Sequence, residues 1–431
     1  MSDRLAIAGG PRAIPEDLQF RMWPQVTEDD ERLVLASLRQ DQHAFGPHAE
    51  KLQSEFAAWN GNRFCFATNS GTAALHMCVA ACGIGPGDEV ITPALSWTSS
   101  ASCILHHNAI PVFVDVDWES MHIDPDAIEA AITPKTRGIL VVHYWGVSCD
   151  MDSILEVAKR HGLAVIEDAC QAVGATYKGR KVGTLGDASA FSLNQNKNLT
   201  GGEGGLFVTN DEATFVRGKA VTSFSDMRPP EAGREYHDYG LGWMYRTSDL
   251  PAAFALSQLR KLDATNAHAI ENWKLLDQKL AGTPHLVPAF QSDDRPTNGY
   301  AYVLRLTPST ATDLQVGLSD LTSGIGEALE AEGIKFSRAN WLLPAHSVFQ
   351  AKNAYGGGYP WSAEHTRRDI SYDLSQYPVS QACIDTCLWN VFSHRPPNGA
   401  EQIDALATAI RKVFTHLDQI PLISQPSRLQ P

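Results

Sequence analysis

Short apolar runs and amphipathic stretches alternate along the chain from about residue 60 to residue 210. The apolar runs at 63–68, 88–93, 111–117, 137–146, 163–168, 188–194 and 205–210 predict strands, and the stretches at 71–83, 96–108, 125–133 and 151–162 predict helices. Apolar strands that alternate with helices are typical of a mostly parallel sheet covered on both faces. Ligands bind such sheets beyond the carboxyl ends of the strands, so the residues after each strand are the first candidates for a site.

The pattern differs on either side of this region. Residues 1–27 look irregular, and helices are predicted at 27–40, 48–59 and, as one long element, 248–280. A strand at 300–306 and helices near 315–332 and 400–417 follow. We therefore predict an N-terminal segment (1–30), a large α/β domain (31–265), a smaller C-terminal α+β domain (266–420) and a tail (421–431).

Charge and cysteine content narrow the range of functions. The chain has 35 basic and 49 acidic residues, for a net charge of −14, which disfavours binding to nucleic acid or to an anionic membrane surface. The eight cysteines form no CxxC pair, and we expect no metal site. We find neither a signal peptide nor an apolar run of membrane-spanning length, and therefore expect a cytoplasmic protein with reduced thiols.

The stretch FSLNQNKNLTGGEGG (191–205) places Lys197 after a predicted strand and before four glycines. A lysine before a turn is usually only an exposed side chain. Imine chemistry, however, needs a lysine whose amine can lose its proton and a backbone that lets a cofactor approach, and the glycines allow that approach. Lys197 is therefore a candidate for binding pyridoxal 5′-phosphate (PLP) as a Schiff base.

Asp168 ends the apolar strand in LAVIEDACQAVGA (163–175), and Gln171 follows three residues later. Such an aspartate can simply cap a helix or bind a metal in another α/β fold. As a PLP ligand it would pair with the pyridine nitrogen and keep the ring protonated, which makes the ring a better electron sink. Gln171 would then donate to the phenolic oxygen of the ring.

Two further strand ends carry suitable residues. In TNSGTAALHM (68–77), Gly71, Thr72 and Ala73 begin a predicted helix, whose free N–H groups suit a phosphate, although most such turns bind nothing. Trp97 in TPALSWTSSAS (92–102) could stack on a cofactor ring or could belong to the core. No Walker loop and no GxGxxG motif is present, which disfavours ATP or NAD. The four strand ends together predict a PLP site built from separate loops.

In these stretches the sequence resembles the DegT/DnrJ-type sugar aminotransferases, which are fold-type I PLP enzymes. SGTAAL (70–75), GDEVITPALSW (87–97), HYWG (143–146), EDACQAVGA (167–175) and FSLNQNKNLTGGEGG (191–205) match in order and spacing. The resemblance implies a three-layer α/β fold with a smaller C-terminal domain, and a homodimer. It also implies that Lys197 binds PLP and then moves protons, with Asp168 on the pyridine nitrogen. Gln171 would contact the phenolic oxygen, Trp97 would stack on the ring, and Thr72, Ala73 and Ser192 would hold the phosphate.

The chain departs from the family pattern in three places. The family segment G-x-N-x-R, whose asparagine reaches the phosphate of the other subunit, is GWMYR (242–246) here, with Met244 at the asparagine position and Arg246 retained. CLWNVFSHRPP (387–397) is similar to the branch that acts on cyclitol ketones. The segment 341–361 looks long enough to form a lid over the substrate site, and His143 and His346 are either site residues or structural histidines.

The resemblance implies a two-stage amino transfer from glutamate or glutamine to a keto-sugar nucleotide or a keto-cyclitol, in the biosynthesis of an aminosugar, an aminocyclitol or an antibiotic. Two alternatives stay open at this point. Related dehydratases, in which histidine replaces the lysine, eliminate water from a sugar. A regulatory protein of the same fold would have lost catalysis.

Overall fold

The computed structural model describes residues 4–21, 23–224, 241–339 and 342–421, together with the backbone of two short strands at 226–227 and 235–236. Its centre is a seven-stranded sheet in the order β1 (Phe64–Thr68), β9 (Gly205–Thr209), β8 (Ala188–Ser192), β5 (Ala164–Asp168), β4 (Thr136–Val142), β2 (Glu89–Pro93) and β3 (Ile110–Val114). Only β9 runs antiparallel to its neighbours, β1 and β8. The predicted, mostly parallel sheet is confirmed.

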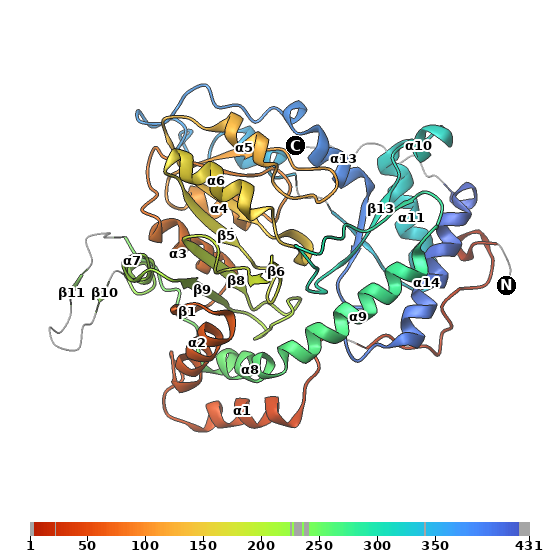
Figure 1. Cartoon of the computed structure of the whole chain (residues 1–431), viewed down its shortest axis with the longest axis horizontal. Helices are drawn as coiled ribbons and strands as arrows, with labels where there is room; N and C mark the ends of the chain where they lie inside the picture. The colour runs from red at the N-terminus through yellow and green to blue at the C-terminus, as the bar shows by residue number, and fades with distance from the viewer. Residues whose placement is uncertain are drawn as a thin grey trace.

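Helices cover this sheet on both faces because its strands are apolar on both sides (Figure 1). The helices of the large domain are α1 (Glu28–Arg39), α2 (Pro47–Asn60), α3 (Gly71–Ala81), α4 (Ser99–Leu105), α5 (Pro125–Ala131), α6 (Met151–His161), α7 (Glu212–Ala220) and α8 (Asp249–Arg260). Phe191 of β8 packs edge-on against Phe56 of α2 at 5.1 Å, in a core that α8 completes. Phe207 of β9 joins Met77 of α3 in a separate core cluster.

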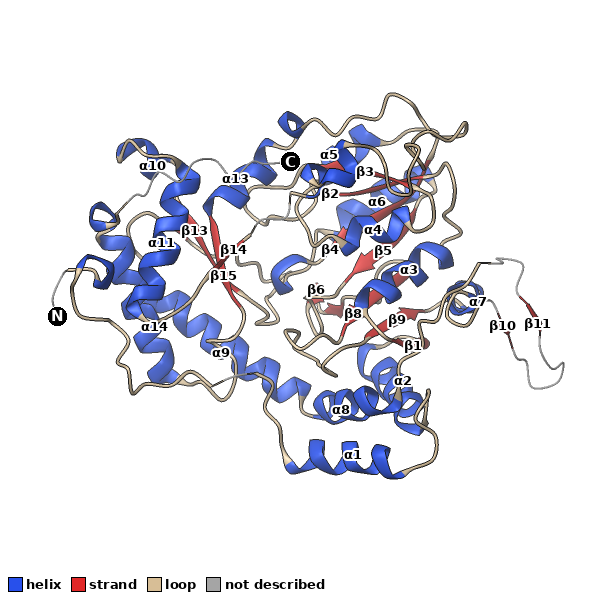
Figure 2. Cartoon of the chain, turned by 180° about the vertical axis from the view of Figure 1, so that it is seen from behind, coloured by secondary structure: helices blue, strands red, loops and turns tan. Residues whose placement is uncertain are grey.

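A second sheet lies to one side of the first, with its own helices (Figure 2). Its strands run in the order β12 (Leu286–Val287), β13 (Tyr302–Leu306), β15 (Cys387–Asn390) and β14 (Ser337–Arg338), and every pair is antiparallel. The helices of this part are α9 (Leu262–Leu280), α10 (Ser309–Asp313), α11 (Leu318–Glu332), α12 (Ser347–Gln350), α13 (Pro378–Thr386) and α14 (Ala400–Thr415). Two further pairs consist of two-residue strands. β6 (Thr176–Tyr177) pairs with β7 (Arg180–Lys181), and β10 (Asp226–Met227) pairs with β11 (Glu235–Tyr236).

The single helix predicted over 248–280 is wrong, because the chain forms two helices, α8 and α9. Lys261 between them has φ −109° and ψ 2°, outside helical geometry. Its ammonium donates to Asp30 at 2.5 Å and to the carbonyl of Gln25 at 3.1 Å. The break between α8 and α9 lies where these tertiary contacts form. No glycine or proline marks this position in the sequence.

The structure shows contacts across both predicted domain boundaries. The N-terminal segment packs on the small domain, and the small domain contacts the large sheet. Leu5 and Ile14 lie in the core of the small domain, and the carboxylate of Glu332 on α11 accepts the backbone N–H groups of Ala6 and Ala13. Tyr372, which lies in the part predicted as the small domain, donates to the carbonyl of Pro111 in β3 of the large sheet. A division of the chain near residue 265 therefore stays a prediction. The predicted tail beyond residue 421 lies outside the described residues.

None of the helices in the described part of the chain combines the length and the apolar character that a membrane span requires.

Candidate active site

A cavity of about 490 Å³ opens at the carboxyl ends of β4, β5 and β8. Seven of the predicted site residues line it, and they come from four separate loops: Gly71, Thr72, Trp97, Asp168, Gln171, Ser192 and Lys197. Ala73 is the exception, because it is buried and its N–H donates to the hydroxyl of Ser70 at 3.1 Å. The parallel topology thus gathers side chains that are far apart in sequence.

The amino end of α3 forms one wall of the cavity. Ser70 caps the helix, and Thr72 shares a hydrogen bond of 2.7 Å with Ser99. A Cβ on Gly71 would lie 2.8 Å from Cβ of Ser192 and 3.0 Å from Sγ of Cys170. Glycine at this position therefore lets the positive end of the helix approach the end of β8, which brings N–H groups and hydroxyls together as an anion site.

Asp168 lies at the end of β5 with only 5% of its surface exposed. One carboxylate oxygen accepts the hydroxyl of Ser100 at 2.7 Å, and the other accepts the N–H of Cys170 at 3.1 Å. Burial, followed by the nearby charge of Asp168, raises the pKa of the Cys170 thiol, so this lining group is neutral. Asp168 is thus a fixed carboxylate suited to a cationic ring nitrogen.

Lys197 reaches the cavity from a loop that the small domain supports. Its ammonium donates to the hydroxyl of Tyr300 at 3.1 Å, and its carbonyl accepts the indole N–H of Trp23 at 2.9 Å. Arg395, of which 2% is exposed, donates to the carbonyl of Asn196 at 2.9 Å and to that of Tyr300 at 3.0 Å. Burial lowers the pKa of Arg395 to about 10. No pattern in the sequence pointed to Tyr300 or Arg395 as site residues.

Two further tryptophans line the cavity beside Trp97, which is 53% exposed. Trp145 follows β4 in a left-handed backbone conformation (φ 57°), which costs a non-glycine residue about 1–3 kcal/mol. The backbone N–H of Trp145 donates to Oε1 of Gln171 at 2.9 Å, which leaves the amide N–H₂ of Gln171 as its donor group. Trp389 of β15 packs against Trp145. Trp145 lies in the motif HYWG (143–146) and Trp389 lies in CLWNVFSHRPP (387–397). These motifs were the only sequence signal for the two tryptophans.

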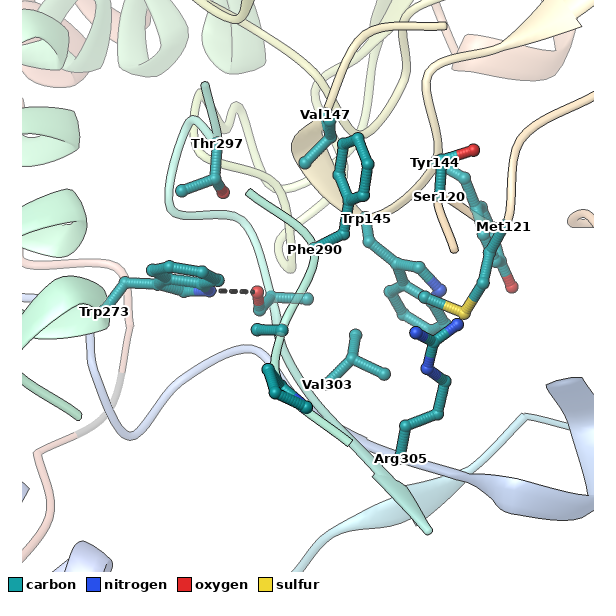
Figure 3. A pocket seen from close by; sticks show the side chains of 13 residues that line it. Ser120, Met121, Tyr144, Trp145, Val147, Trp273, Phe290, Thr297, Val303 and Arg305 are labelled. Atoms are coloured by element: carbon teal, nitrogen blue, oxygen red, sulfur yellow. Dashed lines mark hydrogen bonds between the residues drawn. The ribbon is translucent and has the colours of Figure 1, made fainter. Parts of the chain in front are cut away.

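A much smaller cavity, of about 40 Å³, lies behind Trp145 (Figure 3). Ser120, Met121, Trp273, Phe290 and Arg305 are among the residues that line it. Its volume is too small for a cofactor. Trp145 therefore separates a site of cofactor size from a packing gap between the two domains.

Neither predicted histidine lines the larger cavity. His143 is fully buried, and its Nδ1 accepts the N–H of Cys149 at 3.1 Å, so its single proton lies on Nε2 and is donated to Glu167 at 3.0 Å. It is a structural histidine. His346 belongs to the segment expected to form a lid, but none of the described residues in 342–361 lines the cavity. Leu343 instead donates to the carbonyl of Ala94, and Trp341 lies outside the described residues.

Met244 and Arg246 lie beside β1. Arg246 forms an isolated bridge with Thr68, and its guanidinium contacts the sulfur of Met244 at 3.2 Å. The carbonyl of Met244 accepts the side-chain amide of Asn69 at 3.3 Å, and its side chain is 46% exposed. The segment thus runs next to the loop that begins α3, with the thioether directed at Arg246.

A sequence model of the DegT/DnrJ/EryC1/StrS aminotransferase family matches residues 24–376. Spore coat polysaccharide biosynthesis protein SpsC of Bacillus subtilis is 40% identical over 294 residues, which cover 67% of this chain and 76% of the relative. L-glutamine:2-deoxy-scyllo-inosose aminotransferase of Streptoalloteichus tenebrarius is 35% identical over 410 residues, 92% of this chain and 94% of the relative.

Among solved structures, 3-amino-5-hydroxybenzoic acid synthase superposes with a TM-score of 0.80 at 27% identity, covering 91% of this chain and 98% of that one. The predicted fold-type I architecture is thereby confirmed. The family's aminotransferases use PLP as their cofactor. The chain therefore belongs to the DegT/DnrJ/EryC1/StrS aminotransferase family.

Proposed function

We propose that the protein transfers an amino group from glutamate or glutamine to the ketone of a sugar or cyclitol, using PLP. The observation that carries this proposal is the convergence of Lys197, Asp168, Gln171, Ser192 and the amino end of α3 on one cavity. The name of the relative from Streptoalloteichus includes glutamine as donor and a keto-cyclitol as acceptor, which supports the same pairing here.

The donor set of the cavity fits PLP. The amino end of α3, with Thr72 and Ser192, would hold the phosphate, because backbone N–H groups, hydroxyls and the helix dipole all favour an anion. Asp168 would pair with the ring nitrogen, the amide of Gln171 would donate to the phenolic oxygen, and Trp97 would cover the ring. Bound there, PLP supplies an electron sink for the carbon that loses its proton.

Lys197 has two roles in this proposal. Its Nζ holds the cofactor in the resting enzyme. As a free amine, Nζ would take the proton from the α-carbon of the amino donor and would later return it as an acid. Nζ donates to the hydroxyl of Tyr300 at 3.1 Å, a contact that would hold the amine in the cavity while it moves this proton.

The family resemblance also supports a homodimer. Phe224 and Met244 are 59% and 46% exposed, and they lie on neighbouring segments that the bridge between Ser223 and Met244 joins. Exposed apolar side chains that lie together are typical of a surface that a partner covers. The expected result of light scattering is a particle of twice the 47.0 kDa chain mass. We also place the protein in the cytoplasm, in the biosynthesis of an aminosugar, an aminocyclitol or an antibiotic.

Half-reaction spectroscopy tests the proposed function. Glutamine or glutamate is added to the purified PLP form, and the visible absorbance of the cofactor is followed as it changes to that of the pyridoxamine form. A keto-sugar or keto-cyclitol should then restore the original spectrum. A spectrum that neither donor changes would contradict the proposal. The variant Lys197→Arg, which cannot hold the cofactor through a neutral amine, should show neither the resting absorbance nor the change.

A further inference from the structure

Four buried polar side chains form one hydrogen-bonded network beneath the loop that carries Lys197. They are Asn198, Asn266, Asn298 and Arg395, and we call them the junction network. Each is between 1% and 8% exposed, and none of them lines the cavity. Asn198 belongs to the large domain, whereas the other three come from α9 and from loops of the small domain. The network therefore joins the cofactor site to later parts of the chain.

Asn198, the residue after Lys197, uses its whole side-chain amide in the junction network. Its Nδ2 donates to Oδ1 of Asn266 at 2.8 Å and to the carbonyl of Asn298 at 3.0 Å. Its Oδ1 accepts a guanidinium N–H of Arg395 at 3.0 Å. Loss of any of these bonds would leave a buried polar group without a partner, which is costly. The loop that carries the reactive lysine is thus tied to three later segments.

Asn298 connects the same network to two other loops of the cofactor site. Its Nδ2 donates to the carbonyls of Gln171 at 3.2 Å and Val173 at 3.1 Å, in the loop after β5. Its backbone N–H donates to the carbonyl of Gly146 at 2.9 Å, after β4, where a Cβ would collide with Oδ1 of Asn298. That Oδ1 accepts the N–H of Tyr300 at 2.9 Å. One buried side chain therefore holds two loops of the site together with the tyrosine that contacts the reactive amine.

Arg395 brings a buried cation whose partners are neutral oxygen atoms. It forms no ion pair with a carboxylate of the described residues, and its N–H groups bind two carbonyls and one amide oxygen. Two of these acceptors, the carbonyl of Asn196 and Oδ1 of Asn198, belong to the residues on either side of Lys197. A buried charge is costly unless its hydrogen bonds are made. The small domain can therefore place this arginine favourably only when the lysine loop is in position.

We propose that Asn198 and Asn298 are positioning residues through which the cofactor site and the docked small domain stabilise each other. A cofactor held by Lys197 fixes the loops on one side of the junction network, and these loops then hold the small domain in place. Because coupling between two equilibria is reciprocal, docking strengthens cofactor binding by the same factor. The inference rests on the cofactor site described under the proposed function.

Hydrogen exchange of the protein with and without PLP tests the coupling without turnover. The informative segment is 392–399, which contains Arg395 but does not line the cavity. We expect PLP to slow exchange in this segment at least about fivefold, because local opening there is suppressed. Helix α11, which packs in the core of the small domain, should exchange at the same rate in both forms. No change in 392–399, or an equal slowing in α11, would overturn the proposal.

Asn198→Ala removes the bond between the lysine loop and Arg395. PLP should still bind, as its absorbance will show, but it should slow exchange in 392–399 less than about twofold. The control Asn60→Asp changes another buried asparagine, which donates to the carbonyl of Val182 and does not line the cavity. This control should keep the full effect of PLP. A full effect in Asn198→Ala as well would contradict the role of the network.

Asn298→Asp gives a second test that does not depend on Asn198. A carboxylate oxygen would then face the carbonyls of Gln171 and Val173 in place of an N–H₂ group. The rate constant of the donor half-reaction should fall at least about tenfold, whereas the donor concentration for half-maximal rate should stay within about threefold, because Asn298 does not line the cavity. A wild-type rate, or an equal fall in Asn60→Asp, would count against this role of Asn298.

The proposed function and the coupling fail in different ways. If neither glutamine nor glutamate changes the cofactor spectrum of the wild-type protein, the proposed function is wrong. If the donor half-reaction proceeds but PLP leaves the exchange of 392–399 unchanged, only the coupling is wrong.

Discussion

The ammonium of Lys197 lies 3.1 Å from the hydroxyl of Tyr300. The two residues are 103 positions apart and come from the two parts of the chain that enclose the cavity. The ammonium also lies 5.0 Å from the centroid of the Tyr300 ring. This tyrosine is 4% exposed, and its backbone is bound by Asn298 and Arg395. Docking of the small domain therefore fixes where the reactive amine of the large domain lies.

Replacement of Tyr300 by phenylalanine should slow amino transfer without emptying the site. The variant keeps the ring but loses the hydroxyl that positions Nζ, so kcat should fall about tenfold while the cofactor stays bound. Stopped-flow measurement of the donor half-reaction gives the rate. The pH dependence of the cofactor absorbance should shift as well, because the partner of the amine is gone.

Tyr302→Phe is the matched control for Tyr300→Phe. Tyr302 is equally buried and lies two residues away, but its hydroxyl donates to Asp277, and it does not line the cavity. Equal loss of rate in both variants, with no shift in the absorbance titration of either, would show that Tyr300 acts only through folding.

Gly71→Ala should weaken PLP binding. The new methyl group would collide with Ser192 and Cys170, which forces the amino end of α3 away from the phosphate position. We expect the Kd for PLP, measured by absorbance titration of the cofactor-free protein, to rise about 10- to 100-fold. Gly85→Ala is the control, since its Cβ meets nothing within 4 Å. Similar Kd values for the two variants would contradict this role of Gly71.

Glu167→Gln should lower the free energy of unfolding by about 3 kcal/mol near neutral pH, because a buried and fully bonded carboxylate is lost. The carboxylate accepts N–H groups from Gly183, Leu185 and Gly186 in addition to that of His143. Burial by itself would raise the pKa of Glu167, but these hydrogen bonds outweigh it and lower the pKa below the usual 4.5.

The lowered pKa of Glu167 sets the pH window of this effect. A carboxylate with a lowered pKa in the folded state contributes stability above the unfolded value of 4.5 and loses it as the pH falls through the folded value. The difference between wild type and Glu167→Gln should therefore be greatest above pH 4.5 and shrink in stronger acid. Urea unfolding at several pH values measures it, with the exposed Glu156→Gln as control. A constant difference down to the acid limit would count against this assignment.

The sequence predicted the parts of the site that are local to single strand ends. Asp168 and Ser192 end buried strands, and Lys197 follows one, so their convergence follows from parallel topology alone. The glycine of the Ser-Gly-Thr turn was predicted for the same reason. Each of these residues is recognisable because a periodic apolar run stops immediately before it.

The rest of the site depends on tertiary contacts that no local pattern encodes. Tyr300, Trp389 and Arg395 reach the cavity or its supporting loop only because the small domain docks there. Trp145 adopts positive φ, which the sequence marks only by the following glycine. The role of His143 also depends on tertiary packing. Its burial against Glu167 follows from the packing of β4 beside β5, not from the motif that contains it.

The central claim is that Lys197 holds the cofactor, and borohydride reduction followed by peptide mapping tests it most directly. Reduction of the holoenzyme fixes PLP permanently to the amine that holds it, and mass spectrometry then locates the added mass. We predict that the label lies on Lys197, in the tryptic peptide that runs from Val182 to Arg217 because trypsin does not cut at the modified lysine. A label on any other lysine, or no label on a protein that binds PLP, would contradict the account.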